Sequence, residues 1–172
     1  MTLKGRSSSS RAVLAAALLL AAQAAQAASP AHKLTGFDAG AVDRARNVAI
    51  RKLQDATCRK VFTDFKDTQG RTLQQNLEEW TADPADYVAL VPFLDGSDQK
   101  LCRNTKTMLV AQPGVRRIYV CKAFADFQVK EPGIAESMVI HEILHTLGLG
   151  ENPPTSIEIT QRVEARCSAP SR

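Results

Sequence analysis

Two parts of the N-terminal half show apolar residues at helical spacing. Residues 37–62 (FDAGAVDRARNVAIRKLQDATCRKVF) place small and aliphatic side chains three or four positions apart, beginning at Ala41. This spacing predicts one helix over the whole segment. Residues 72–80 (TLQQNLEEW) predict a second, short helix, which Asp83-Pro84 would follow as a break.

Two more helices are predicted in the C-terminal half. Residues 131–147 are apolar on most sides, which is typical of a buried helix, and Gly148 supplies a stop signal. Residues 155–166 (TSIEITQRVEAR) predict a last helix that begins with a capping box between Thr155 and Glu158.

Strand signals lie between these helical segments. Residues 87–94 (YVALVPFL) are apolar and of strand length, and residues 107–111 and 115–121 flank the turn Gln112-Pro113-Gly114. The pattern predicts an α+β fold with N-terminal helices, a short antiparallel sheet of about three strands, a long buried helix and a short C-terminal helix.

Residues 1–27 have the features of a secretory signal peptide. Three basic residues precede an apolar run over residues 12–22, and Ala25-Gln26-Ala27 fits a small-x-small cleavage site. The apolar run is too short to cross a bilayer, so we expect cleavage after Ala27 and no stable membrane anchor. Residues 28–172 have the length of a single domain, secreted or periplasmic.

Charge narrows the classes of partner. The leader holds three of the 22 basic residues and none of the 18 acidic ones, so residues 28–172 carry 19 basic residues against 18 acidic ones. A nearly neutral chain without a basic cluster gives no reason to expect binding to nucleic acid or anionic lipid. The sequence leaves the oligomeric state open.

Four cysteines follow the leader, and an even number in an exported chain predicts two disulfides. We expect Cys102 to pair with Cys121, joining neighbouring strands. Cys58 would then pair with Cys167 and tie the first long helix to the C-terminal end.

The sequence HEILHTLGLGE, from His141 to Glu151, carries the candidate chemistry. His141 and His145 are one helical turn apart, so both imidazoles can reach one metal ion. Glu142 lies beside them and could move protons as a general base. Burying two imidazoles and a carboxylate without a partner would cost several kcal/mol, and a metal ion, which we expect to be zinc, is the simplest partner for all three.

The composition of the chain does not decide which residue is the third protein ligand of the metal ion. The remaining histidine, His32, lies near the expected new N-terminus and is a weak candidate. A carboxylate would then complete the site. Glu151 follows the glycine turn, Glu158 belongs to the capping box, and Glu164 lies in the last predicted helix.

Residues 141–151 resemble the metzincin signature HExxHxxGxxH at every fixed position except the last, where this chain has Glu151. In that family the glycine turns the chain so that the residue three positions later faces the zinc ion. The resemblance therefore implies that Gly148 makes the turn and Glu151 is the third ligand. This chain departs from the family because no methionine follows the signature to form the methionine turn.

Two further resemblances exist. The separation of His145 and Glu164 is similar to that in gluzincin-type aminopeptidases, in which a second helix supplies a glutamate, so Glu164 is the alternative third ligand. Residues 118–124 followed by the HExxH helix resemble small secreted aspzincin proteases, although their glycine-rich aspartate motif is absent. All these resemblances to known families cover only about residues 115–167 of the chain.

These resemblances imply a secreted zinc-dependent peptidase that hydrolyses peptide bonds, with Glu142 as general base. A peptide or protein substrate would add as a strand to residues 107–111 or 115–121. Tyr87 or Tyr119 could stabilise the oxyanion, or could serve as sheet residues. The alternative is a non-catalytic exported protein with a structural His/His/Glu zinc site.

Overall fold

A computed structural model describes residues 34, 36–81 and 83–168 of the chain. The expected leader, its cleavage site after Ala27, and His32 lie outside the described residues. Within the described part the fold is α+β, as expected, and no helix there is long and apolar enough to cross a membrane. The helices and strands are α1 (Gly36–Lys52), α2 (Ala56–Arg59), α3 (Val61–Asp64), α4 (Leu73–Glu78), α5 (Pro84–Leu90), β1 (Phe93–Asp95), the 3-10 helix η1 (Leu101–Arg103), β2 (Leu109–Ala111), β3 (Ile118–Val120), α6 (Ala123–Lys130), α7 (Pro132–Thr146) and α8 (Ser156–Cys167).

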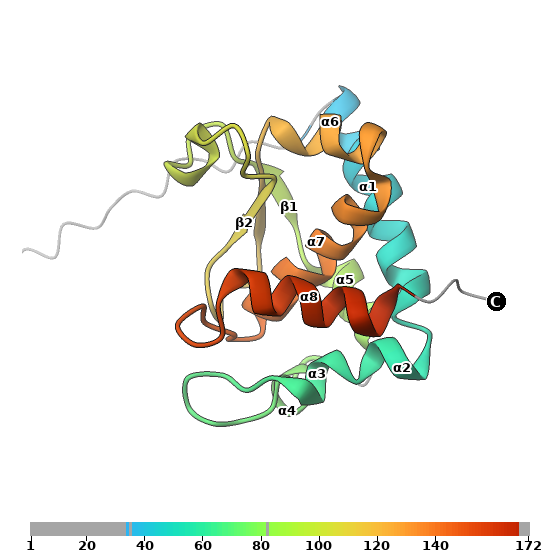
Figure 1. Ribbon diagram of the computed structural model, residues 1–172, viewed down its shortest axis with the longest axis vertical. Helices are drawn as coiled ribbons and strands as arrows, with labels where there is room; N and C mark the ends of the chain where they lie inside the picture. Colours follow the sequence, from blue (N-terminus) through green and yellow to red (C-terminus); the bar gives the residue numbers. More distant parts are fainter. Residues whose placement is uncertain (1–33, 35, 82, 169–172) are drawn as a thin grey trace, which may run out of the picture.

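Helix α7 lies at the centre of the molecule. It packs against α1 and α6 on one side, against α8 on another, and against β2 and β3 of the sheet (Figure 1). Pro132 occupies its first turn, where the missing amide costs no hydrogen bond. Aliphatic side chains on several faces, including Val139, Ile140, Ile143 and Leu144, are fully buried. The buried helix predicted over residues 131–147 is confirmed.

The described sheet has three strands in the order β1-β3-β2. The predicted hairpin is confirmed, since β2 and β3 are antiparallel and Val110 faces Tyr119. The expected antiparallel pairing applies to β2 and β3 alone among the described strands, because β1 pairs with β3 in parallel. Strand β2 therefore forms one edge of the described sheet.

The strand predicted over residues 87–94 is wrong for most of its length. Residues 84–90 form helix α5, and only Phe93–Asp95 is a strand. The side chain of Asp83 accepts the amide of Ala85, and Pro84 fills the first turn, so local capping starts a helix before the apolar run. A short apolar run fits a buried helix as well as a strand.

The single helix predicted over residues 37–62 is divided into α1, α2 and α3. Helix α1 ends at Lys52, and the carboxylate of Asp55 accepts the amides of Thr57 and Cys58. An aspartate in this position caps a new helix better than it continues an old one. Helix α6, at residues 123–130, was not predicted; no element was expected between the strand at residues 115–121 and the helix at residues 131–147.

Both expected disulfides are present. Cys58–Cys167 joins α2 to the end of α8 across 109 residues, so it ties a short helix, not the first long helix, to the C-terminal end. Cys102–Cys121 joins η1 to the residue after β3 across 19 residues, so it holds a loop against the sheet and does not join two strands.

Candidate metal site

The polar residues of the motif are buried on α7. His141, Glu142 and His145 expose only 1%, 5% and 4% of their surfaces. Burial of three ionisable groups in an apolar helix is unfavourable unless each finds a partner. The contacts of these three side chains therefore decide what the site can do.

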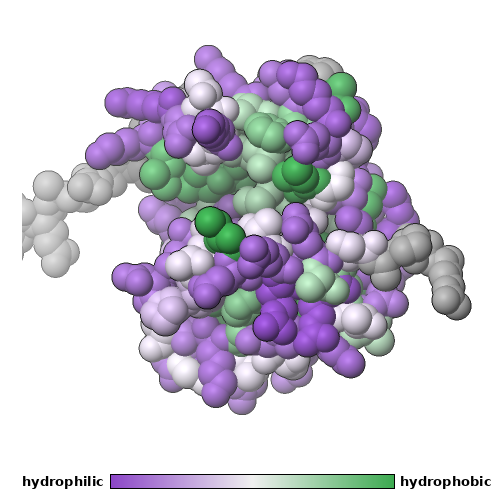
Figure 2. All heavy atoms as spheres, in the orientation of Figure 1, coloured by the Kyte–Doolittle hydropathy of each residue, from purple (hydrophilic) through white to green (hydrophobic). Residues whose placement is uncertain are grey.

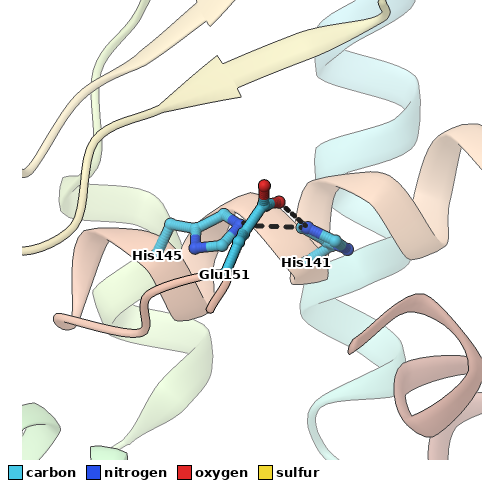
Figure 3. A group of neighbouring side chains, drawn as sticks. All are labelled: His141, His145 and Glu151. Atoms are coloured by element: carbon cyan, nitrogen blue, oxygen red, sulfur yellow. Dashed lines mark hydrogen bonds and ion pairs between the residues drawn. The ribbon is translucent and has the colours of Figure 1, made fainter. Parts of the chain in front are cut away.

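The structure brings His141, His145 and Glu151 together as a group that could hold a metal ion. The Nε2 atoms of the two histidines are 3.0 Å apart, and Oε1 of Glu151 lies 3.6 Å from Nε2 of His141 and 3.3 Å from Nε2 of His145 (Figure 3). Two ligands of a tetrahedral zinc ion with bonds of about 2.1 Å lie roughly 3.4 Å apart. The three atoms thus form a triangle of the right size for three ligands of one ion.

The opposite nitrogen of each imidazole is held by a hydrogen-bond partner. Nδ1 of His145 donates to the carbonyl oxygen of Leu149 at 2.7 Å. Nδ1 of His141 lies 3.0 Å from Oγ1 of Thr160, whose hydroxyl faces the sulfur of Met138 at 3.9 Å. A carbonyl only accepts, so Nδ1 of His145 carries the proton and Nε2 keeps its lone pair in the neutral ring. Such partners fix the ring orientation that a metal site needs.

Gly148 makes the turn that brings Leu149 and Glu151 to the histidines. Its φ of +105° is strained for any residue with a side chain, and an added Cβ would lie 3.1 Å from Cβ of Asp67. After the turn, the amide of Leu149 donates to the carbonyl of Leu144. Glycine is therefore required here by both backbone conformation and space.

Two residues of the N-terminal half, Asp67 and Asn76, stabilise this turn. The amide group of Asn76 on α4 donates to the carbonyl of Leu147 and to Oδ2 of Asp67, each at 2.8 Å. The other carboxylate oxygen of Asp67 accepts the amides of Gln69 and Arg71. The sequence alone did not predict this contact, because Asn76 and Asp67 are about seventy or more positions away from the motif.

Glu142 lies beside the group and next to β2. Burial raises the pKa of its carboxyl to about 8, the backbone amide of Ala111 opposes that shift, and the charge of Glu151 adds to it. Without a cation nearby, this carboxyl holds its proton at neutral pH. A bound cation would favour the carboxylate.

The acid–base equilibrium of His141 is also perturbed. Burial, reinforced by the proximity of His145, lowers the pKa of His141 to about 4, and Glu151 opposes that shift. His141 is therefore neutral over the physiological range and available as a ligand. Both perturbed groups belong to one small cluster, which is typical of functional sites.

A cleft of about 480 Å³ opens onto the group. Figure 2 shows apolar side chains gathered on the face of the molecule drawn there. They lie above the position that α8 has in Figure 1, which is drawn in the same orientation. Glu142, His145 and Glu151 line the cleft together with β2 and Met138. A larger hollow of about 780 Å³ near Phe127 contains none of the three metal-ligand candidates.

The other candidate residues lie elsewhere. Glu158 completes the predicted capping box by accepting the amide of Thr155 at 2.8 Å. Glu164 is half-buried on α8 and is not part of the group formed by the two histidines and Glu151. Tyr87 is fully buried in α5, where its hydroxyl meets Oγ1 of Thr146. Tyr119 lies on β3, and neither tyrosine lines the cleft.

Comparisons of this chain with protein-family models, with curated proteins and with solved structures found no match. The chemistry of the site is therefore inferred from its own residues and their geometry. Two imidazoles and one carboxylate beside a buried carboxyl form a donor set that fits a divalent metal ion of the zinc type.

Proposed function

We propose that this chain is an exported zinc-dependent peptidase of the HExxH type. His141, His145 and Glu151 would hold the ion, and Glu142 would act as general base. The observation that carries the proposal is the triangle of 3.0, 3.3 and 3.6 Å formed by the three ligand atoms beside a buried carboxyl. Two imidazoles and one carboxylate form a common ligand set of catalytic zinc.

The number of ligands supports catalysis over a structural role. Structural zinc sites use four protein ligands, whereas catalytic sites use three and leave a position for water or substrate. Among the described residues, the group of possible ligand side chains has three members. The cleft beside them gives a substrate access to the open position.

The residues of the chain have separate roles in this reaction. A zinc ion held here would polarise the scissile carbonyl and acidify the attacking water. Glu142 accepts the proton of that water as oxygen bonds to the carbonyl carbon, then delivers it to the leaving nitrogen when the C–N bond breaks. Thr160 and the carbonyl of Leu149 keep both imidazoles aimed at the ion.

Three observations support export and a zincin relationship. Both disulfides formed by the four cysteines are compatible with an oxidising compartment. Residues 1–27 have the pattern of a signal peptide. The resemblance of residues 141–151 to the metzincin signature agrees with a turn at Gly148 and a third ligand at Glu151.

The test compares hydrolysis of an unfolded protein by the zinc-loaded wild type, Glu142→Gln and Glu131→Gln. Glu131 is exposed at the start of α7 and serves as the matched control. We expect Glu142→Gln to keep one zinc ion and lose hydrolysis by about 10²-fold or more, with Glu131→Gln unchanged. Equal hydrolysis by all three proteins would contradict the role of Glu142.

The alternative is a non-catalytic exported zinc-binding protein that uses the same ligands. It would bind one zinc ion and hydrolyse no peptide under any condition. Metal content separates this alternative from a protein without a metal site, and hydrolysis separates it from the peptidase.

A further inference from the structure

The hydroxyl group of Thr160 bridges two residues of α7. Its oxygen lies 3.0 Å from Nδ1 of His141 and 3.9 Å from the sulfur of Met138. His141 and Met138 are three positions apart and share one face of that helix, and α8, which carries Thr160, packs against it (Figure 1). Three side chains from two helices therefore form one chain of polar contacts that ends at a metal-ligand candidate.

The proton of this hydroxyl decides the tautomer of His141. A hydroxyl group has one proton to donate, and the thioether sulfur of Met138 can only accept it. Because Thr160 donates to the sulfur, its oxygen accepts the proton on Nδ1 of His141. Nε2 then keeps the lone pair that binds a metal ion. Met138 thus sets the direction of both hydrogen bonds.

The sulfur chemistry of the cleft is confined to two thioethers. All four cysteines are held in disulfides. Met138 and Met108 are the methionines of the described part of the chain, and both are half-buried and line the metal cleft. Only Met138 of these two accepts a hydrogen bond from Thr160. A small reagent that enters the cleft therefore reaches both sulfurs, but only one of them is linked to a metal-ligand candidate.

We propose that Met138 is an oxidation site for peroxides, and that its conversion to the sulfoxide weakens metal binding through Thr160. A lone pair of the sulfur attacks one oxygen of hydrogen peroxide, the O–O bond breaks, and an S–O bond forms. The sulfur loses two electrons, and the other peroxide oxygen leaves as water. This inference depends on the metal site of the proposed function, because it assigns a means of regulation to that site.

The sulfoxide alters the contacts of Thr160 in two ways. Its oxygen is a stronger acceptor than the thioether sulfur and lies one bond length beyond it, so the hydroxyl of Thr160 moves to meet it. The polar sulfoxide also packs poorly where Met138 contacts the apolar core. Both changes loosen the contact between Thr160 and Nδ1 of His141, which orients the ring for the metal ion.

The test treats the folded, disulfide-bonded residues 28–172 with hydrogen peroxide in the presence of a chelator, which prevents metal-catalysed oxidation of the histidines. Peptide mass mapping locates the added oxygen. After removal of both reagents, competition with a coloured zinc chelator measures zinc affinity. We expect sulfoxide at Met138 and an affinity lower by about 10-fold or more than that of the untreated protein.

Three variants locate the effect. Met138→Leu keeps an apolar side chain without an oxidisable sulfur, so peroxide should leave its zinc affinity unchanged. Met108→Leu is the matched control and should lose affinity as the wild type does, because Met138 remains. In Thr160→Val there is no hydroxyl for the sulfoxide to displace, so oxidation should cause little further loss.

Several results would overturn this inference and leave the proposed peptidase standing. These are a Met138 that peroxide does not oxidise, a Met138 sulfoxide that binds zinc as tightly as before or more tightly, an equal loss in Met138→Leu, and an undiminished loss in Thr160→Val. Absence of zinc binding before treatment would instead overturn the proposed metal site, and this inference with it. Zinc binding without hydrolysis would overturn the peptidase alone.

Discussion

The hydroxyl of Thr160 on α8 lies 3.0 Å from Nδ1 of His141 on α7, although the two residues are 19 positions apart. Thr160 is the group that orients this metal-ligand candidate. The orientation of the His141 ring therefore depends on the packing of α8 against α7, so α8 contributes to the site.

Removal of the Thr160 hydroxyl should weaken metal binding. Thr160→Val keeps the shape of the side chain but leaves Nδ1 of His141 without its partner. We expect zinc affinity to fall by about 10- to 100-fold, and Thr160→Ser to retain most of it. Competition with a coloured zinc chelator measures both. Equal affinity in Thr160→Val and the wild type would show that this contact does not orient the ring.

Glu142→Gln should stabilise the metal-free protein at alkaline pH. The folded pKa of Glu142 is raised to about 8 from an ordinary 4.5, so its stabilising contribution is complete below pH 4.5 and is lost as pH rises through 8. The glutamine side chain is neutral at every pH. Chemical unfolding in chelator should show equal stability near pH 4.5 and an advantage of a few kcal/mol for Glu142→Gln above pH 8. A pH-independent difference between the two proteins would contradict a pKa of Glu142 that is raised by burial.

Gly148→Ala should destabilise the fold and displace the third ligand. The positive φ costs an alanine about 1–2 kcal/mol, and its Cβ would press on Asp67. Gly133→Ala is the control, because Gly133 lies in the first turn of α7 with nothing within 4 Å of an added Cβ. Thermal unfolding and zinc affinity should both decline in the first variant only. A similar decline in both variants would argue against a special role for the turn.

Loss of the Cys58–Cys167 disulfide should affect both stability and metal affinity. The bond closes a segment of 109 residues and holds the end of α8. Replacing both cysteines by alanine should cost about 2–5 kcal/mol. Zinc binding should weaken as well, because α8 carries Thr160. Asp64 and Arg166 still join α3 to α8 by two hydrogen bonds, so the variant should remain folded at low temperature. Unchanged zinc affinity in the folded variant would separate the disulfide from the site.

The sequence predicts the site better than it predicts the sheet. His141, His145 and Glu151 meet because helical spacing and a glycine turn are local properties, readable over eleven residues. The capping box of α8 and the long helix α7 follow from equally local signals.

What the sequence does not predict depends on packing between distant segments. Residues 84–90 form a helix because Asp83 and Pro84 cap it and Tyr87 packs into the core, while the apolar run alone fits either structure. The parallel pairing of β1 with β3 depends on the path of the chain between them, which runs through η1 and β2. Thr160 and Asn76 belong to no recognisable sequence motif. Only the tertiary arrangement brings them to the site.

Zinc binding by the folded and oxidised residues 28–172 tests the central claim most directly, when the wild type is measured beside Glu151→Ala and Glu164→Ala. The account predicts one zinc ion per chain for the wild type and Glu164→Ala, and an affinity lower by about 10²-fold or more for Glu151→Ala. A wild-type protein that binds no zinc, or a loss confined to Glu164→Ala, would contradict it.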